Sequence, residues 1–234
     1  RSGYGAGGLW KSHVKGGNQV SLDESMIHDI VQKVMANMQI AGSVEGMHGV
    51  FQDMNDAIKA SIEAQKVVRN LSLDQREKII SAIRRKTHEN AEIIANMGVN
   101  ETGMGNVGDK ILKHHLTADK TPGTEDLSTI AWSGDRGLTL VEMGPFGVIG
   151  AITPATNPSE TVICNSIGMI AGGNTVVFNP HPNAKKTTIF TINMINEASL
   201  EAGGPDNIAV TVETPTMDSS AVMMKHPAIP LLVA

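Results

Sequence analysis

The only cysteine of this 234-residue sequence, Cys164, is the first residue whose type could carry covalent chemistry. A nucleophilic thiol must ionise, and reactive cysteines lie at accessible positions beside positive charge or at the start of a helix. This one stands inside "SETVICNSIGMIAGG", next to Val162, Ile163 and Ile167 and without a nearby cation. We therefore predict that Cys164 is a buried packing residue. A single cysteine permits no internal disulfide, which suits a reducing cytoplasm.

Three polar segments that follow predicted strands are better candidates for a ligand site. They are "TPATNP" (Thr153–Pro158), "NPHP" (Asn179–Pro182) and "ETPT" (Glu213–Thr216). Each comes after an apolar run, respectively "FGVIGAITP", "NTVVFNP" and "NIAVTVE". Ligands of open parallel sheets bind outside the carboxyl ends of the strands. We therefore expect these three segments to share one edge of a sheet.

The elements that position these segments alternate regularly along the second half of the chain. Helices are predicted in "SETVICNSIGMIAGG", "NAKKTTIFTINMINEASLEAG" and "TMDSSAVMMKH", and "IPLLVA" is a further strand. Repeated strand–helix units with nearly continuous apolar strands are typical of a doubly wound parallel sheet with helices on both faces. The predicted fold class is therefore α/β. Because a strand at the very end of a chain is unusual, we expect a portion of a longer protein.

The first half of the chain is predicted to be helical. One helix is expected in "VFQDMNDAIKASIEAQKVVRNL", and a longer one begins at the cap residue Ser72. Around residues 129–143 the pattern changes, because "STIAW" and "LTLVEM" are β-prone and flank "SGDRG". That pattern predicts a β-hairpin. A two-stranded ribbon is only marginally stable alone, so we expect it to pair with a partner.

A separate amphipathic helix is predicted near the N-terminus, in "SLDESMIHDIVQKVMANM". Its apolar residues recur at helical spacing, and "AGSVEG" follows as a linker. Two readings remain open: a helix folded back on its own domain, or a docking peptide for a partner groove. A membrane-surface helix is disfavoured, because the polar face carries Asp23, Glu24 and Asp29 against one lysine.

The composition excludes several classes of protein. With 41% apolar and 18% charged residues the chain has the composition of an ordinary soluble protein. Its net charge of -5 argues against nucleic-acid binding, which requires a concentrated basic face. No apolar run approaches the ~20 residues needed to span a bilayer. The glycine-rich start, "RSGYGAGGLWKSHVKGGNQ", lacks the apolar core of a signal peptide and is read as a flexible lead-in.

An ordered set of motifs in residues 100–234 resembles the aldehyde dehydrogenase superfamily, and within it the CoA-acylating propionaldehyde and acetaldehyde dehydrogenases of bacterial microcompartments. The matching pieces are "NETGMGNVGDKILKH", "TPGTEDL", "GLTLVEMGPFGVIGAITPATNPSET", "GNTVVFNPHPNA" and "HPAIPLLVA". The leading helix looks like the encapsulation peptides that direct such enzymes into shells. The resemblance therefore implies that residues 21–39 bind a microcompartment shell protein, that the enzyme is cytoplasmic within a microcompartment, and that it forms a homo-oligomer.

The resemblance also implies a catalytic role for Asn157. In the superfamily, an Asn after the first strand of the cofactor sheet stabilises the oxyanion that forms when the catalytic cysteine adds to the aldehyde. A carboxamide N–H aimed at developing negative charge in a dry site contributes on the order of 3 kcal/mol. The alternative reading is an Asn that merely starts the helix before Pro158.

For the cofactor, the resemblance implies NAD, with NADP left open, and CoA as a second substrate in the same groove. Asn179 stands where many family members carry a ribose-binding Lys, and this departure fits the CoA-acylating branch. His181 is expected either to contact phosphate or adenine or to be an exposed turn residue. No metal site is expected. The expected cofactor-binding residues are Ile152, Thr153, Pro154, Ala155, Asn179, Pro180, His181, Pro182, Thr214 and Pro215.

The activity implied for the intact protein is oxidation of a short-chain aldehyde, propanal or acetaldehyde, to acyl-CoA with reduction of NAD. The nucleophilic cysteine is expected beyond Ala234, so this chain alone is expected to be inactive. Two alternatives stay open: a portion of a hydrolytic aldehyde dehydrogenase, and a non-catalytic nucleotide module that binds a shell. The expected segments are a lead-in (1–20), an encapsulation-type helix (21–40), a linker (41–46), a helical part of the cofactor domain (47–128), an oligomerisation-type hairpin (129–143) and an incomplete Rossmann-like dinucleotide-binding sheet (144–234).

Overall fold

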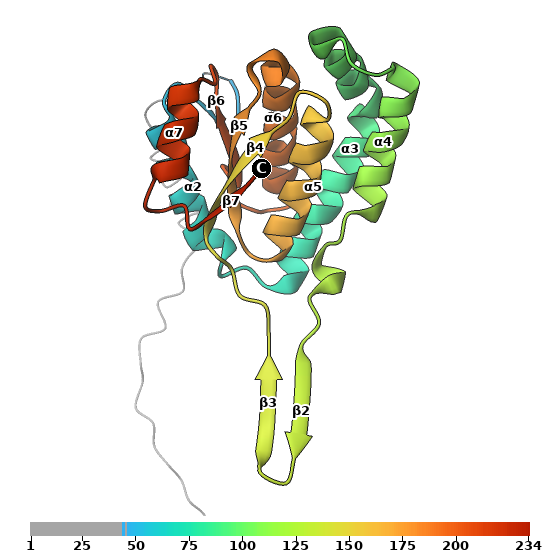
Figure 1. Cartoon of the computed structure of the whole chain (residues 1–234). Coiled ribbons are helices and arrows are strands. Elements are labelled where there is room, and N and C mark those ends of the chain that lie inside the picture. The colour runs from blue at the N-terminus through green and yellow to red at the C-terminus, as the bar shows by residue number, and fades with distance from the viewer. Residues whose placement is uncertain (1–43, 45) are drawn as a thin grey trace, which may run out of the picture. The chain divides into compact units, whose positions relative to one another are not determined.

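The computed structural model of the protein describes residue 44 and residues 46–234. Five parallel strands form one sheet in the order β1-β6-β5-β4-β7 (Figure 1). The predicted lead-in and the amphipathic helix over residues 21–39 lie outside the described residues. The strands are β1 (Val50–Phe51), β4 (Val148–Thr153), β5 (Thr175–Pro180), β6 (Ala209–Val212) and β7 (Leu231–Val233).

Helices cover both faces of this sheet, as the alternating pattern predicted (Figure 1). α5 and α6 lie on one face with α3 and α4 outside them, and α2 and α7 lie on the other. Successive strand side chains point to opposite faces. Val176 and Phe178 of β5 pack in the core on the α5 and α6 side, and Val177 packs in the core on the α2 and α7 side. The α/β doubly wound fold is therefore confirmed. The helices are α2 (Met54–Val68), α3 (Leu73–Thr102), α4 (Val107–Lys120), α5 (Pro158–Ala171), α6 (Lys185–Glu201) and α7 (Met217–Lys225), with short 3-10 turns η1 (Thr124–Asp126) and η2 (Pro182–Ala184).

The strand order contains a topological switch point at β4. The chain passes from β4 to β5 and then to β6 on one side, and β7 returns to the opposite side of β4. A strand order that reverses in this way opens a crevice at the carboxyl end of the strand where it reverses, here β4. The segment that follows β4 is "PATN", so the polar residues singled out by the sequence lie at this edge.

The predicted hairpin is confirmed as an antiparallel ribbon of β2 (Ile130–Gly134) and β3 (Gly137–Val141). It projects away from the layered sheet at the amino end of β4 (Figure 1). All of its strand residues are exposed, including the large apolar side chains of Ile130, Trp132, Leu138 and Leu140. An exposed apolar ribbon of this kind is typical of a surface that a partner covers.

One feature of the first half differs from the expectation. Val50 and Phe51, predicted to begin a helix, form the edge strand β1, because Thr211 N donates to Gly49 O at 2.8 Å and the pair is buried beside β6. The longer predicted helix is confirmed as α3, with Ser72 as its N-cap in a capping box. It ends at Gly103 in a left-handed conformation, so α4 is a separate helix.

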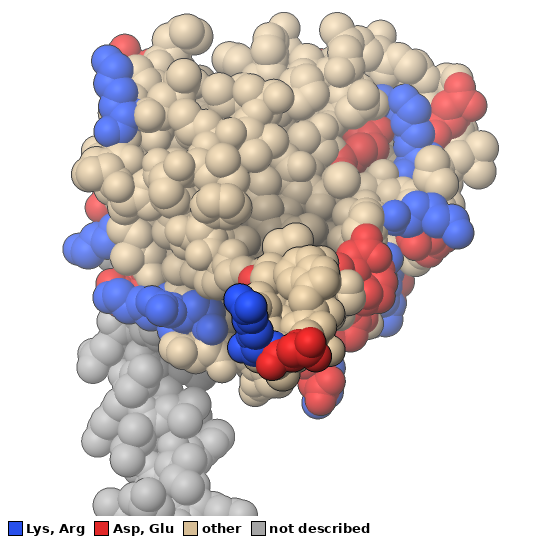
Figure 2. All heavy atoms as spheres, turned by 60° about the horizontal axis from the view of Figure 1, so that its bottom comes forward, with Lys and Arg blue, Asp and Glu red and all other residues tan. Residues whose placement is uncertain are grey.

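Two further properties of the described residues concern the apolar character of the helices and the charge of the surface. None of the described helices has both the length and the apolar character that crossing a bilayer requires. On the face drawn in Figure 2, positive and negative side chains are intermingled, mainly along the edges, and most of the remaining surface is uncharged. No concentrated basic area is visible on that face.

The start of β6 depends on one buried amide. Asn196 of α6 is fully buried; its Oδ1 accepts from Ile208 N at 3.0 Å, and its Nδ2 donates to Ala209 O at 2.6 Å. A Cβ at Gly49, whose φ is +75°, would collide with Ala209 O and the Asn196 amide. The Asn196 amide therefore joins α6 to the start of β6, and the glycine before β1 packs directly against this contact.

We predict that Asn196→Ala destabilises the fold by about 3 kcal/mol, because it leaves a buried donor and a buried acceptor unpaired. The measurement is the midpoint of urea unfolding followed by circular dichroism. Asn96→Ala is the matched control, since the Asn96 amide bonds only to Glu92 O of its own helix and is exposed. The control is expected to change stability by less than about 0.5 kcal/mol. Equal midpoints for the two variants would contradict the role given to Asn196.

Candidate active site

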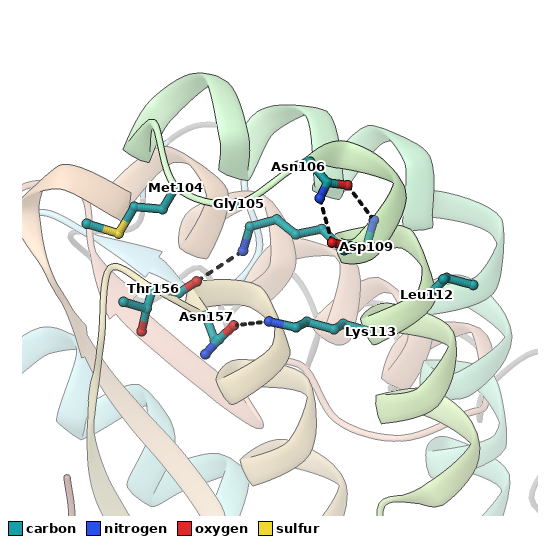
Figure 3. A pocket seen from close by; sticks show the side chains of 9 residues that line it. Met104, Gly105, Asn106, Asp109, Leu112, Lys113, Thr156 and Asn157 are labelled. Atoms are coloured by element: carbon teal, nitrogen blue, oxygen red, sulfur yellow. Dashed lines mark hydrogen bonds between the residues drawn. The ribbon is translucent and has the colours of Figure 1, made fainter.

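Asn157 lies in the turn between β4 and α5. It occupies the N-cap position before Pro158, with φ -138° and ψ 63°, but its side chain makes no capping hydrogen bond. The alternative reading of this residue as a simple helix cap is therefore incomplete. Its Oδ1 instead accepts from Lys113 Nζ at 3.3 Å, which leaves Nδ2 facing away from that lysine (Figure 3).

A pocket of about 660 Å³ opens beside this amide (Figure 3). One side is formed by the turn before α4 and the first turns of that helix, and the other by the turn after β4. The volume lies in the range of small-molecule sites. The lining combines amide and charged groups with exposed apolar side chains. The lining residues are Met104, Gly105, Asn106, Asp109, Lys110, Leu112, Lys113, Thr156 and Asn157.

A buried ion pair lies behind the turn. Lys110 of α4 is only 3% exposed, and its Nζ donates to Glu160 Oε1 at 3.3 Å and to the main-chain O of Thr156 at 3.0 Å. Glu160, in the first turn of α5, is 7% exposed. Buried charges require a paired and hydrogen-bonded partner. The ammonium therefore holds α5 and the peptide that precedes Asn157 at fixed positions relative to α4.

His114 and Ser159 adjoin this pair and form a Ser–His–Glu group with its Glu160. His114 Nε2 lies 2.7 Å from Ser159 Oγ, and that hydroxyl donates to Glu160 Oε2 at 3.2 Å. Because the single hydroxyl hydrogen of Ser159 points to Glu160, His114 Nε2 carries the proton in this arrangement. Burial lowers the pKa of His114, so its ring is neutral near pH 7. The three residue types match a nucleophilic triad, but both His114 and Ser159 are buried and inaccessible, so the group holds α4 against α5.

The predicted cofactor residues around β4 lie at the expected edge. Ile152 and Thr153 end β4, and Pro154 and Ala155 follow. The exits of β4 and β5 are joined, since His181 N donates to Thr153 O at 3.1 Å. The Thr153 hydroxyl is buried and has no hydrogen-bond partner among the described residues. Such an orphaned hydroxyl beside the switch point suits a polar ligand.

Asn179 has a different environment from the one expected. It lies within β5 and is buried; its Nδ2 donates to Ser220 Oγ at 2.6 Å, and its Oδ1 accepts from Ser219 Oγ at 2.7 Å. The amide thus joins β5 to the first turn of α7, whose N-cap is Thr216. Its side chain is engaged within the fold, whereas a ribose-binding Lys would extend into the groove.

The remaining predicted cofactor residues lie on both sides of the contact between Asn179 and α7. Pro180 ends β5 and is buried, while His181 and Pro182 are exposed. The His181 ring accepts from Asn183 N at 3.1 Å, which agrees with an exposed turn residue. Thr214 is exposed and Pro215 is buried, before α7. The structure brings the three segments together at one sheet edge, and their cofactor contacts stay a prediction. Within residues 46–234, no group of three or more His, Cys, Asp or Glu side chains could hold a metal ion.

The prediction that Cys164 is buried is wrong, because its side chain is exposed. The buried residues of α5 include Val162, Ile163, Ser166 and Ile167, which form the stripe against the sheet. Position 164 is turned about 100° from position 163 around the helix axis, and so leaves that stripe. Apolar neighbours in sequence were therefore a poor guide. Cys164 stands in the middle of α5, away from the helix start, and its thiol does not line the pocket.

The sequence reasoning missed the side chains of α4 and the first turn of α5. Lys110, Lys113 and His114 belong to the motif "NVGDKILKH", which was matched as a family signature without roles for its residues. Their i, i+3 and i+4 spacing places them on one helix face. Two lysines and a histidine on one face, next to apolar positions, could have predicted that these side chains contact one polar segment elsewhere in the fold.

Comparison with known proteins supports this assignment of the fold. Residues 32–234 match the model of the "Aldehyde dehydrogenase family". An "Acetaldehyde dehydrogenase (acetylating)" of Bilophila wadsworthia (strain 3_1_6) is 44% identical over 219 residues, which are 90% of this chain and 45% of that protein. The chain thus spans less than half the length of that relative.

Solved structures give the same result. A propionaldehyde dehydrogenase from the Clostridium phytofermentans fucose utilisation bacterial microcompartment is 71% identical, with a TM-score of 0.79 over 80% of this chain and 43% of that one. A Rhodopseudomonas palustris propionaldehyde dehydrogenase, with bound CoA and an acylated cysteine, is 48% identical, with a TM-score of 0.78 over 80% of this chain and 43% of that one. A match that includes most of the chain, together with the same doubly wound sheet, establishes that this chain belongs to the aldehyde dehydrogenase family.

Proposed function

We propose that this chain is the cofactor-binding portion of a CoA-acylating aldehyde dehydrogenase, which converts a short-chain aldehyde, CoA and NAD into acyl-CoA and NADH. The observation that carries the proposal is the Asn157 amide, which makes no capping bond, accepts from Lys113 through Oδ1 and leaves Nδ2 facing away from that lysine beside a pocket at the switch point. The relatives named above support propanal or acetaldehyde as the substrate. Because the chain spans under half of their length, the activity of the whole protein is part of the proposal.

Asn157 is proposed to act on the carbonyl oxygen of the aldehyde. When a thiolate adds to the carbonyl carbon, negative charge develops on that oxygen, and Asn157 Nδ2–H donates to it. A fixed donor in such a site is worth about 3–4 kcal/mol of transition-state stabilisation. Cys164 does not line the pocket, so we assign the nucleophile to a residue outside these 234 positions.

The nicotinamide dinucleotide, when bound, accepts the hydride of the aldehyde carbon. The chain would hold it at the exits of β4, β5 and β6, with contacts from residues 152–155. Asn179, engaged with Ser219 and Ser220, offers no extended cation to a ribose there. We propose that this leaves room for CoA in the same groove after the dinucleotide departs.

Two other functions stay as alternatives. A hydrolytic aldehyde dehydrogenase would use the same Asn157 chemistry and release free acid; the bound CoA in the R. palustris relative favours the acylating reaction for this chain. A non-catalytic nucleotide module would bind a shell without turnover. The accessible pocket at Asn157, whose lining combines amide and charged groups with apolar side chains, favours an enzyme over this module.

The proposed assembly has two contacts. Residues 21–39 are proposed to bind a shell protein, which would place the enzyme within a bacterial microcompartment in the cytoplasm. The hairpin β2–β3 is proposed to pair with another copy of the chain, because its apolar side chains are exposed on both faces of the ribbon. Removal of residues 21–39 should abolish shell association and leave dinucleotide binding intact.

We predict that Asn157→Ala lowers kcat/KM for the aldehyde by about 10²–10³-fold, because the oxyanion loses its side-chain donor. The assay is acyl-CoA formation by the protein expressed from the complete reading frame that encodes this chain. Dinucleotide affinity, measured by calorimetry, should not change. Asn165→Ala, in α5 but outside the pocket, is the control and should retain activity.

Two outcomes would contradict this part of the proposal. Full activity of Asn157→Ala would remove Asn157 from the reaction. Free acid as the main product, with acyl-CoA absent at saturating CoA, would identify the hydrolytic alternative.

We predict that the double variant Leu138→Lys and Leu140→Lys reduces the oligomeric mass, because two charges on one face of the ribbon oppose its burial in an interface. Light scattering after size-exclusion chromatography measures the mass. Asp135→Lys at the ribbon tip is the matched control and should leave the mass unchanged. An unchanged mass for the double variant would exclude this face of the hairpin as the interface.

A further inference from the structure

We propose that Lys113 is a positioning residue, which holds the Asn157 carboxamide with its N–H groups directed into the pocket, and that Lys110 fixes the main chain of the same turn. The inference rests on the oxyanion role proposed above for Asn157. It goes further because it names what orients the amide, and it assigns a task to two lysines that the sequence motifs left unexplained.

The two lysines reach the same turn from one helix face. They are three residues apart on α4, a spacing that places side chains next to each other. Lys110 Nζ lies 3.0 Å from the main-chain O of Thr156, and Lys113 Nζ lies 3.3 Å from Asn157 Oδ1 (Figure 3). The carbonyl before Asn157 and the carbonyl on its side chain are thus both bound by ammonium groups of α4.

The helix that carries these lysines is itself anchored. Its N-cap, Asn106, accepts from Asp109 N at 2.9 Å, and α4 packs against both α3 and α5. Its buried face joins the first turn of α5 through the Lys110–Glu160 pair and the contact between His114 and Ser159. The ammonium of Lys113 therefore extends from a platform that is fixed to the turn it contacts.

The chemistry of the ammonium sets the direction of the amide. A carboxamide has an acceptor end and a donor end of nearly equal size, whereas an ammonium can only donate. Rotation of the Asn157 amide by 180° would place its NH₂ against the NH₃⁺ of Lys113, donor against donor. The observed orientation is the one that satisfies both groups, and it leaves Nδ2 free for the pocket.

The charge has a second effect. A bond from a cation to Oδ1 polarises the amide and strengthens its N–H as a donor. Lys110 cannot supply this effect in the same degree, because Glu160 neutralises it. Among the ion pairs of the described residues, none involves Lys113, so its charge is not cancelled by a carboxylate there.

The test is a double-mutant cycle between Lys113 and Asn157, in the protein expressed from the complete reading frame. Lys113→Met should lower kcat for acyl-CoA formation about tenfold with little change in KM, because the amide spends less time in the donating orientation. Lys113→Arg, which keeps a cationic donor without an acceptor, should recover activity to within about threefold. Lys120→Met, on the exposed end of the same helix, is the control for loss of a lysine.

In the Asn157→Ala background, Lys113→Met should cause no further loss, since the amide on which it acts is gone. Losses that multiply would overturn the proposal, because Lys113 would then act independently of Asn157. Equal losses in the Met and Arg variants would also overturn it.

A second measurement does not depend on activity. In the ¹⁵N-labelled 234-residue chain, Lys113→Met should shift the side-chain amide resonances of Asn157 and increase their mobility, while those of Asn196 stay unchanged. If the protein expressed from the complete reading frame forms no acyl-CoA, the proposed function fails. The resonance measurement then decides by itself whether Lys113 positions the Asn157 amide. Unaltered Asn157 resonances would refute the positioning role whatever the activity.

Discussion

The buried pair of Lys110 and Glu160 is the interaction on which the site depends. Two charges at 3% and 7% exposure are tolerable only together, because either one alone would lack a counter-charge in a medium that solvates it poorly. Their mutual requirement joins α4 to the first turn of α5. The spare donor capacity of the ammonium is used on the Thr156 carbonyl, so the constraint extends to the turn that presents Asn157. A desolvated charge pair of this kind contributes more to defining a position than to total stability.

The parallel sheet supplies the other constraint. Since β7 returns to the opposite side of β4, the turn after β4 has no neighbouring crossover above it and can receive a ligand. The same turn is reached from the side by α4, which belongs to the first half of the chain. The site is therefore built from a strand exit and a distant helix, and neither the sheet nor the helical half forms it alone.

The sheet was predictable from sequence because each strand is an apolar run bounded by turn residues, and each helix carries its own period. The position of Asn157 followed from the same pattern. Three features were not predictable in this way. Val50 and Phe51 become a strand only because β6 offers an edge, which is a contact distant in sequence. Cys164 leaves the buried stripe by its rotation about the helix axis, which neighbouring residue types do not encode. The link from Lys110 to Glu160 spans 50 positions, so no local pattern contains it.

The edge strand β7 has a consequence for handling the chain in solution. Only one side of β7 is paired within residues 46–234, with β4, and Leu232 is 41% exposed. A bare strand edge is a template to which any extended segment can add. Concentrated preparations of these 234 residues should therefore gain β-structure and scatter light with time, through backbone pairing that side-chain changes in the hairpin leave untouched. Capping this edge with an added strand would be the route to a well-behaved sample.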